Sequence, residues 1–170
     1  MKRLIVMRHA TTEPSSPGGD AERPLTAAGH AEAARVGRWL VSRGYSPDLA
    51  LCSTARRVHE TWVEVEKAFD SPPTARFDRA LYMATAHDLL LEASEVGDDV
   101  SAVILVAHNP AVSHLAFELT EHADPDGRER LRRGFRPATT AVFEGVGDAF
   151  GDLPEMGARL VDFVAVDELE

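Results

Sequence analysis

The sequence predicts an α/β protein in which two layers of helices cover a mostly parallel central sheet. Two short, uninterrupted apolar runs, at residues 4–7 and 103–106, suit strands that are buried on both faces. Segments with helical spacing of apolar residues alternate with the strand-like segments, as in parallel sheets covered by helices. The chain has 170 residues and is 44% hydrophobic, which is enough for one core. We therefore expect a single domain over residues 1–170 with a three-layer α/β/α architecture.

The composition excludes several classes of partner and site. Eighteen basic and twenty-eight acidic residues give a net charge of −10, whereas nucleic acids and acidic membranes attract proteins with a positive field. The single cysteine, Cys52, excludes an internal disulfide and a zinc site built from cysteines. The apolar run that begins at residue 4 is too short for a signal peptide, and no segment has membrane-spanning length. We expect a cytoplasmic protein that binds neither nucleic acid nor membrane.

Caps and breaks define the elements in the first half of the chain. A loop rich in Pro, Gly and Ser follows the first strand at residues 13–23, and loops of this size often carry function. Thr26 is the expected N-cap of the first helix, and Gly44 marks its end. Ser53 follows the second strand and is the expected cap of the second helix, which the Pro-Pro pair at residues 72–73 ends. The expected strands here are residues 4–7, 48–52 and 74–77, and the expected helices are residues 27–41 and 55–69.

The second half contains the clearest strand, which ends at Ala107 and precedes a helix whose first turn Pro110 fits. The charged segment at residues 124–136 predicts a loop or a short frayed helix. The last two strands are predicted from alternating apolar residues. The expected strands here are residues 100–107, 139–146 and 160–166, and the expected helices are residues 89–96 and 110–119.

Polar side chains follow three of the predicted strands at the point where each strand ends. Because the carboxyl ends of parallel strands meet at one edge of a sheet, we expect these side chains to lie close together. Two imidazoles and two guanidiniums on one rim would suit a tetrahedral oxyanion, since guanidinium forks bind phosphate oxygens in pairs. The sequence has no Walker-type glycine loop, so side chains would hold the phosphate. The side chains expected there are Arg8 and His9, then Ser53 and Arg57, then His108 and Asn109.

Four motifs in the chain resemble those of the histidine phosphatase superfamily, which has the phosphoglycerate-mutase-like fold. They occur in the order that the family shows and together span most of the chain. The length and the His-Asn-Pro motif are most similar to the small phosphohistidine phosphatases of the SixA type. The motifs are Arg8-His9-Ala10-Thr11-Thr12, Leu25-Thr26-Ala27-Ala28-Gly29, Ser53-Thr54-Ala55-Arg56-Arg57-Val58-His59-Glu60-Thr61 and His108-Asn109-Pro110.

The resemblance implies that His9 attacks phosphorus and forms a phosphohistidine intermediate, which water then hydrolyses. It also implies that Arg8, Arg57 and His108 stabilise the charge on the transferring phosphoryl group. These fixed cations would replace a metal, so we expect no metal and no cofactor. Residue chemistry supports the same roles, because a neutral imidazole is a nucleophile and guanidiniums bind phosphate.

The sequence departs from the family pattern at three places. Ala10 stands where the family has glycine, and Thr54 stands where it has a proline after Ser53. Met83 stands about where many relatives carry a glutamate that protonates the leaving group. Asp78 and Asp88 are the candidates to replace that acid. A missing acid slows the hydrolysis of alkyl esters most, because an alkoxide needs a proton to leave, and it disfavours a mutase.

Three further residues are candidate substrate contacts, each with a structural alternative. Thr12 can bind phosphate or order its loop, Ser53 can bind phosphate or cap a helix, and Asn109 can bind substrate or hold its loop by hydrogen bonds. The arginine run from Arg128 to Arg136 is interpreted as a solvated face rather than a docking patch. The remaining histidines lack the spacing of metal ligands.

The expected function is a metal-independent phosphatase that acts on phosphohistidine in a protein. A phosphatase for small phosphomonoesters is the alternative substrate class. A non-catalytic module that binds phosphate or a phosphoprotein is the alternative from another class. The partner is therefore a phosphorylated protein or a small phosphorylated metabolite, and we expect a monomer.

Overall fold

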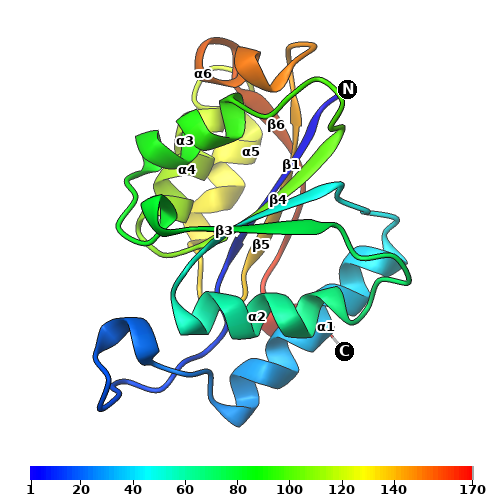
Figure 1. The fold of residues 1–170 in the computed structure, drawn as a ribbon. Coiled ribbons are helices and arrows are strands. Elements are labelled where there is room, and N and C mark those ends of the chain that lie inside the picture. Colours follow the sequence, from blue (N-terminus) through cyan, green and yellow to red (C-terminus); the bar gives the residue numbers. More distant parts are fainter. Residues whose placement is uncertain (170) are drawn as a thin grey trace.

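The computed structural model describes residues 1–169, and its central feature is a six-stranded mixed sheet (Figure 1). The strand order is β3-β2-β4-β1-β5-β6. The first four of these strands are parallel to one another, and β5 and β6 are antiparallel to their neighbours. The predicted α/β class and mostly parallel sheet are confirmed. The strands are β1 (Arg3–Arg8), β2 (Leu49–Ser53), β3 (Thr74–Asp78), β4 (Ala102–Ala107), β5 (Thr140–Gly145) and β6 (Ala158–Val164).

Helices cover both faces of the sheet, as Figure 1 shows. Alternate residues of β1 enter two separate cores, because successive side chains of a strand point to opposite faces. Leu4 and Val6 pack with the side of α3 and α4, whereas Ile5 and Met7 pack with the side of α1 and α2. The helices are α1 (Ala27–Ser42), α2 (Arg56–Glu66), α3 (Ala86–Ser94), α4 (Ala111–Thr120), α5 (Pro125–Arg130) and α6 (Leu153–Met156).

Two helix starts differ from the prediction. The side chain of Ser53 does not cap α2, because Ser53 is still the last residue of β2 and Ala55 occupies the N-cap position. The third helix begins three residues earlier than residue 89, because Thr85 and Asp88 form a reciprocal capping box that fixes its first turn.

The charged segment near residue 124 is more ordered than a frayed helix. Asp124 accepts a hydrogen bond from the Gly127 backbone N–H and so caps α5, whose first residue is proline. The short helix α6 was not predicted, because four residues are too few to show helical periodicity. No helix within residues 1–169 has both the length and the apolar character needed to cross a membrane.

A close approach between α1 and the segment after β1 requires a glycine. A Cβ atom added to Gly29 would lie 2.0 Å from the backbone oxygen of Thr11. We expect the substitution Gly29→Ala to lower the free energy of unfolding by about 1–3 kcal/mol, because backbone must move to make room. Urea denaturation followed by circular dichroism measures this change.

The matched control is Gly151→Ala. A Cβ atom there would lie 3.7 Å from its nearest neighbour, which is an ordinary contact, so the stability should change by no more than about 0.5 kcal/mol. Equal effects of the two substitutions would contradict the role of Gly29 in seating α1.

Candidate active site

The register of the parallel strands aligns three polar strand ends at one edge of the sheet. Arg8 pairs with Ala107 across β1 and β4, and Cys52 pairs with Val106 across β2 and β4. Ser53, the residue after Cys52, therefore lies level with Ala107 and Arg8, and His108 and His9 follow one residue later, just beyond the ends of β4 and β1. The edge predicted from the sequence is the place where these side chains meet.

Hydrogen bonds from both sides fix the backbone of His9. Its N–H donates to the carbonyl of Ala107 at 3.2 Å, and its carbonyl accepts from the N–H of Ala138 at 3.0 Å. Ala138 has a φ of 66°, a left-handed conformation that is uncommon outside glycine and that clusters at functional sites. His9 is 6% exposed and lies at the floor of the site.

The imidazole of His9 is held in the tautomer of a nucleophile. Its Nδ1 lies 2.8 Å from the carbonyl oxygen of Ala10, and because a carbonyl only accepts, Nδ1 carries the proton. Nε2 therefore keeps its lone pair. Burial is the main cause that lowers the pKa of His9 to about 3. The hydrogen bond to Ala10 opposes this shift, and the neighbouring His108, Arg57 and Arg8 act in the same direction as burial. His9 is neutral near pH 7.

The second imidazole faces the first. The ring centroids of His9 and His108 lie 5.4 Å apart. His108 Nε2 lies 2.8 Å from Oγ of the buried Ser53, so this serine orients the ring. Burial is the main cause that lowers the pKa of His108 to about 4; the charges of Arg57 and Arg8 act in the same direction, and Asp20 opposes them.

Arg8 is anchored at the end of β1. Its Nη1 donates to the carbonyl of Phe135 at 2.9 Å, and Nδ2 of Asn109 donates to the same oxygen at 2.8 Å. Burial lowers the pKa of Arg8. Its Nε is buried and has no acceptor among residues 1–169. Asn109 therefore has a structural contact, which was one of its two predicted roles.

Arg57 lies in the first turn of α2 and is 7% exposed. Its Nη1 donates to the carbonyl of Asp20 at 2.9 Å, and its Nη2 lies 3.1 Å from the carboxylate of the same residue. The Tyr82 ring lies against the guanidinium, 5.8 Å from ring centroid to Cζ. Within the described chain the buried Nε of Arg57 has no acceptor. A buried donor without an acceptor costs about 1–3 kcal/mol, which an anion at this site would recover.

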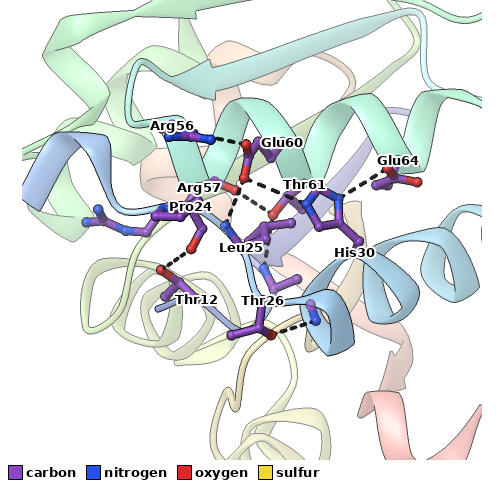
Figure 2. A network of polar contacts seen from close by, with 12 residues as sticks. Thr12, Pro24, Leu25, Thr26, His30, Arg56, Arg57, Glu60, Thr61 and Glu64 are labelled. Carbon is purple, nitrogen blue, oxygen red and sulfur yellow. Dashed lines mark hydrogen bonds and ion pairs between the residues drawn. The ribbon is translucent and has the colours of Figure 1, made fainter. Parts of the chain in front are cut away.

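A buried threonine joins the two halves of the site (Figure 2). Thr61 Oγ1 donates to the carbonyl of Arg57 at 2.7 Å and accepts from the N–H of Ala10 at 3.1 Å. The residue after His9 is thus tied to the turn of α2 that carries Arg57. Figure 2 also shows Glu60, which accepts from the N–H of Leu25 at 2.8 Å and joins the start of α1 to α2.

The other predicted site residues lie in structural contacts. Thr12 donates to the carbonyl of Pro24 at 2.9 Å and so orders its loop. Asp78 accepts from the N–H of Ala80 at 2.8 Å, and Asp88 belongs to the capping box of α3. The hydrogen bonds to Thr85 lower the pKa of Asp88. Met83 is 83% exposed. The structure therefore gives neither aspartate the environment of a general acid.

Most of the arginine run makes contacts within the chain. Arg133 pairs with Glu168, Arg132 Nε lies 2.6 Å from Glu129, and the Arg128 guanidinium lies 5.4 Å from the Phe117 ring centroid. Such contacts agree with a solvated face and leave little free charge for docking.

Three residues that contact the predicted site were missed from the sequence. They are Asp20, Thr61 and Tyr82. The available signals were the functional character of the loop at residues 13–23, the place of Thr61 at the end of the third family motif, and the position of Tyr82 next to Met83. Hydroxyls and carboxylates so far from the strand ends give no periodic pattern that places them.

The described residues hold no group of three or more His, Cys, Asp or Glu side chains placed to bind a metal ion. Burial raises the pKa of Cys52 to about 12, so this thiol is a poor nucleophile. The groups with reactive character are thus the neutral His9 and the cations beside it.

Comparisons with known proteins find similar sequences and similar folds. The profile of the Histidine phosphatase superfamily (branch 1) matches residues 4–81. An uncharacterized protein of Mycobacterium tuberculosis is 33% identical over 159 residues, covering 92% of this chain and 98% of the relative. A structure from Nakamurella multipartitia, described as the phosphohistidine phosphatase SixA, is similar with a TM-score of 0.85 and 30% identity over 96% of this chain and 95% of that one. A structure from Agrobacterium tumefaciens, also described as the phosphohistidine phosphatase SixA, is similar with a TM-score of 0.80 and 30% identity over 96% of this chain and 97% of that one.

The bridge made by Thr61 can be tested by Thr61→Val, which keeps the shape and removes the hydroxyl. The buried N–H of Ala10 would lose its acceptor, so the free energy of unfolding should fall by about 1–3 kcal/mol. Affinity for inorganic phosphate, measured by calorimetry, should also fall, because Arg57 and His9 would no longer be held together.

Thr120→Val is the matched control. Thr120 is equally buried and also donates to the carbonyl four residues before it, Ala116, at 2.9 Å, but it joins no second segment. It should leave phosphate affinity unchanged. If both substitutions weakened phosphate binding equally, the bridge would not matter to the site.

The two neutral histidines make stability depend on pH. Their folded pKa values of about 3 and about 4 lie below the ordinary 6.5, so between these values the unfolded chain binds more protons. Stability is complete above pH 6.5 and is lost as pH falls. Between pH 7 and pH 5 we expect each histidine to remove about 1–2 kcal/mol from the free energy of unfolding.

Urea denaturation at several pH values in phosphate-free buffer measures this loss. The double substitution His9→Gln with His108→Gln should flatten the curve, whereas His87→Gln, at an exposed position, should not. A wild-type curve that is flat from pH 7 to pH 5 would contradict the buried neutral state.

Proposed function

The chain belongs to the histidine phosphatase superfamily, and on this premise we propose that it is a metal-independent phosphatase with His9 as nucleophile and phosphohistidine in a protein as substrate. The observation that carries the proposal is the state of His9. Its Nδ1 is occupied by the carbonyl of Ala10, and its pKa is about 3. Nε2 is therefore an unprotonated nucleophile at any pH near neutrality.

The proposed reaction has two steps. In the first, Nε2 of His9 forms a bond to phosphorus as the bond from phosphorus to the leaving group breaks, and the bonding pair departs with that group. In the second, a water oxygen attacks phosphorus and the His9 nitrogen regains its lone pair, which releases phosphate. Both steps need stabilisation of the equatorial oxygens, and Arg8, Arg57 and His108 surround the position of His9.

The groups that would stabilise the phosphoryl oxygens are positioned before substrate arrives. Phe135 anchors Arg8, Asp20 anchors Arg57, and Ser53 orients His108. Donors that need no reorganisation during the reaction contribute most to the rate, and each commonly gives a factor of about 10²–10³. Burial of the site strengthens these interactions, because the surrounding dielectric is low.

The kind of leaving group is inferred from the lack of a general acid placed to protonate it among the described residues. Asp78 and Asp88 hold backbone N–H groups, and neither is placed as a proton donor. An alkoxide would depart slowly from such a site, whereas an imidazole or an aryl oxide is stable enough to leave. The two similar structures described as phosphohistidine phosphatase SixA support the same substrate class.

The first test is hydrolysis of p-nitrophenyl phosphate in the presence of EDTA. The wild type should turn over the substrate, and His9→Ala should lose at least about 10³-fold in kcat, because the proposed nucleophile is gone. Arg57→Ala should lose about 10²–10³-fold in kcat/KM, because one phosphate cation is gone. His59→Ala, a change at an exposed histidine of the same helix as Arg57, is the control and should keep full activity.

The second test separates the substrate classes. A histidine-phosphorylated carrier protein should be dephosphorylated with a higher kcat/KM than any member of a panel of sugar phosphates and nucleotides. A preference for one of those small esters would make the alternative correct. Phosphate binding without any turnover would instead identify a non-catalytic module.

A further inference from the structure

A carboxylate lies at the mouth of the candidate active site. The Asp20 side chain is 53% exposed, whereas His9 at the floor is 6% exposed. Asp20 belongs to the loop at residues 13–23, which passes beside the start of α2 in Figure 1. Besides Arg57, its carboxylate accepts from Arg23 Nη1 at 2.9 Å and from the hydroxyl of Tyr82.

Asp20 meets Arg57 along only one edge of the guanidinium. The backbone carbonyl of Asp20 accepts a hydrogen bond from Nη1 of Arg57, and the Asp20 carboxylate accepts one from Nη2. These are the two terminal nitrogens, and Nε, on another edge, is buried without an acceptor in residues 1–169. A phosphoryl oxygen can therefore use the Nε edge while Asp20 stays in place. The additional bonds from Arg23 and Tyr82 also hold the carboxylate where it is.

The geometry of phosphoryl transfer places the leaving group near this carboxylate. Attack and departure lie roughly in line, so a group that leaves when His9 attacks from the floor departs towards the mouth. The Tyr82 ring forms part of that mouth, since it meets the ring of His108 edge-on with centroids 5.6 Å apart. Its hydroxyl reaches Asp20. The leaving group thus meets a phenol and a carboxylate.

We propose that Asp20 determines substrate specificity by selecting phosphoramidates with a cationic leaving nitrogen over phosphate esters that carry a further negative charge. The proposal rests on the proposed phosphatase function and names the group that selects within it. A carboxylate attracts the protonated ring of phosphohistidine and repels the carboxylate or second phosphate of many metabolites.

The bonds of the selected reaction balance without an external acid. When phosphohistidine is protonated on its distal ring nitrogen, that N–H can donate a hydrogen bond to the Asp20 carboxylate. When Nε2 of His9 bonds to phosphorus, the P–N bond breaks and its electron pair returns to the ring nitrogen. The product is a neutral imidazole that keeps its distal proton. Asp20 favours the protonated, more reactive form of the substrate and transfers no proton itself.

The charge of Asp20 is permanent over the working range of pH. The hydrogen bond from Tyr82 holds the pKa of this carboxyl well below its usual value, and those from Arg23 and Arg57 act in the same direction. The same contact with Asp20 raises the pKa of Tyr82. Asp20 is thus unsuited to donate a proton to an alkoxide and suited to act as a fixed negative charge.

The test compares kcat/KM for phosphoimidazole, p-nitrophenyl phosphate and 3-phosphoglycerate in the wild type and in Asp20→Asn. The amide keeps the size of the side chain and removes the charge. The ratio of phosphoimidazole to 3-phosphoglycerate should fall by about tenfold or more in the variant. p-Nitrophenyl phosphate, whose leaving group carries neither a cation nor a second anionic group, reports any loss of the Arg57 anchor that is common to all three substrates.

Asp162→Asn is the matched control. Asp162 is also held by an arginine and a tyrosine, with Arg43 Nη2 at 2.9 Å and the Tyr45 hydroxyl at 2.9 Å, but it lies on β6, away from the strand ends that form the site. It should leave the ratio unchanged. Tyr82→Phe, which removes one bond to the Asp20 carboxylate, should lower the ratio by a smaller factor than Asp20→Asn.

Each other outcome overturns the inference. An equal loss on all three substrates would make Asp20 only a positioning residue for Arg57, and an equal gain would make it a competitor of phosphate. Turnover with an unchanged ratio would remove this inference and leave the proposed function intact. No turnover of any substrate by the wild type would remove both.

Discussion

The register between β1 and β4 is the constraint on which the candidate site depends. Arg8 lies beside Ala107, so His9 and His108 leave the sheet at the same level and their rings face each other at 5.4 Å. A slip of one residue would turn every side chain of β1 to the opposite face, since a strand has a period of two. It would move Leu4 and Val6 out of their core and Arg8 out of its contact with Phe135. The apolar cores that fix the register therefore also fix the positions of His9, His108 and Arg8.

Burial at this edge of the sheet determines the charge state of each group. The guanidiniums of Arg8 and Arg57 donate hydrogen bonds to backbone carbonyls, and Arg57 also pairs with one carboxylate. The imidazoles, which are buried near those cations, become neutral instead. Uncharged imidazoles beside guanidiniums form a site with the character that the proposed reaction needs. The same burial that keeps His9 neutral is expected to make the fold less stable in acid.

The strand ends could be predicted from the sequence because their placement follows from topology. An apolar run followed by Arg8-His9 or His108-Asn109 shows where a strand ends, and parallel strands bring such ends together. The spacing of Thr85 and Asp88 is also a known signal for the start of a helix. The predicted start at residue 89 did not use this signal and lies three residues too late. Asp20 and Thr61 could not be found in this way. Their partners lie 37 and 51 residues away along the chain, and only the folded loops bring them together.

The position of Asp20 and the lack of a placed general acid have one explanation. An acid at the mouth would have to be protonated near neutral pH, and so would need a raised pKa. The surroundings of Asp20 do the opposite, because Tyr82, Arg23 and Arg57 all stabilise its ionised form. A fixed negative charge is of no use to an alkoxide that needs a proton, but it stabilises a leaving group that already carries one. Under the proposed function, the arrangement that disfavours ordinary phosphate esters is thus the one that favours protonated phosphohistidine.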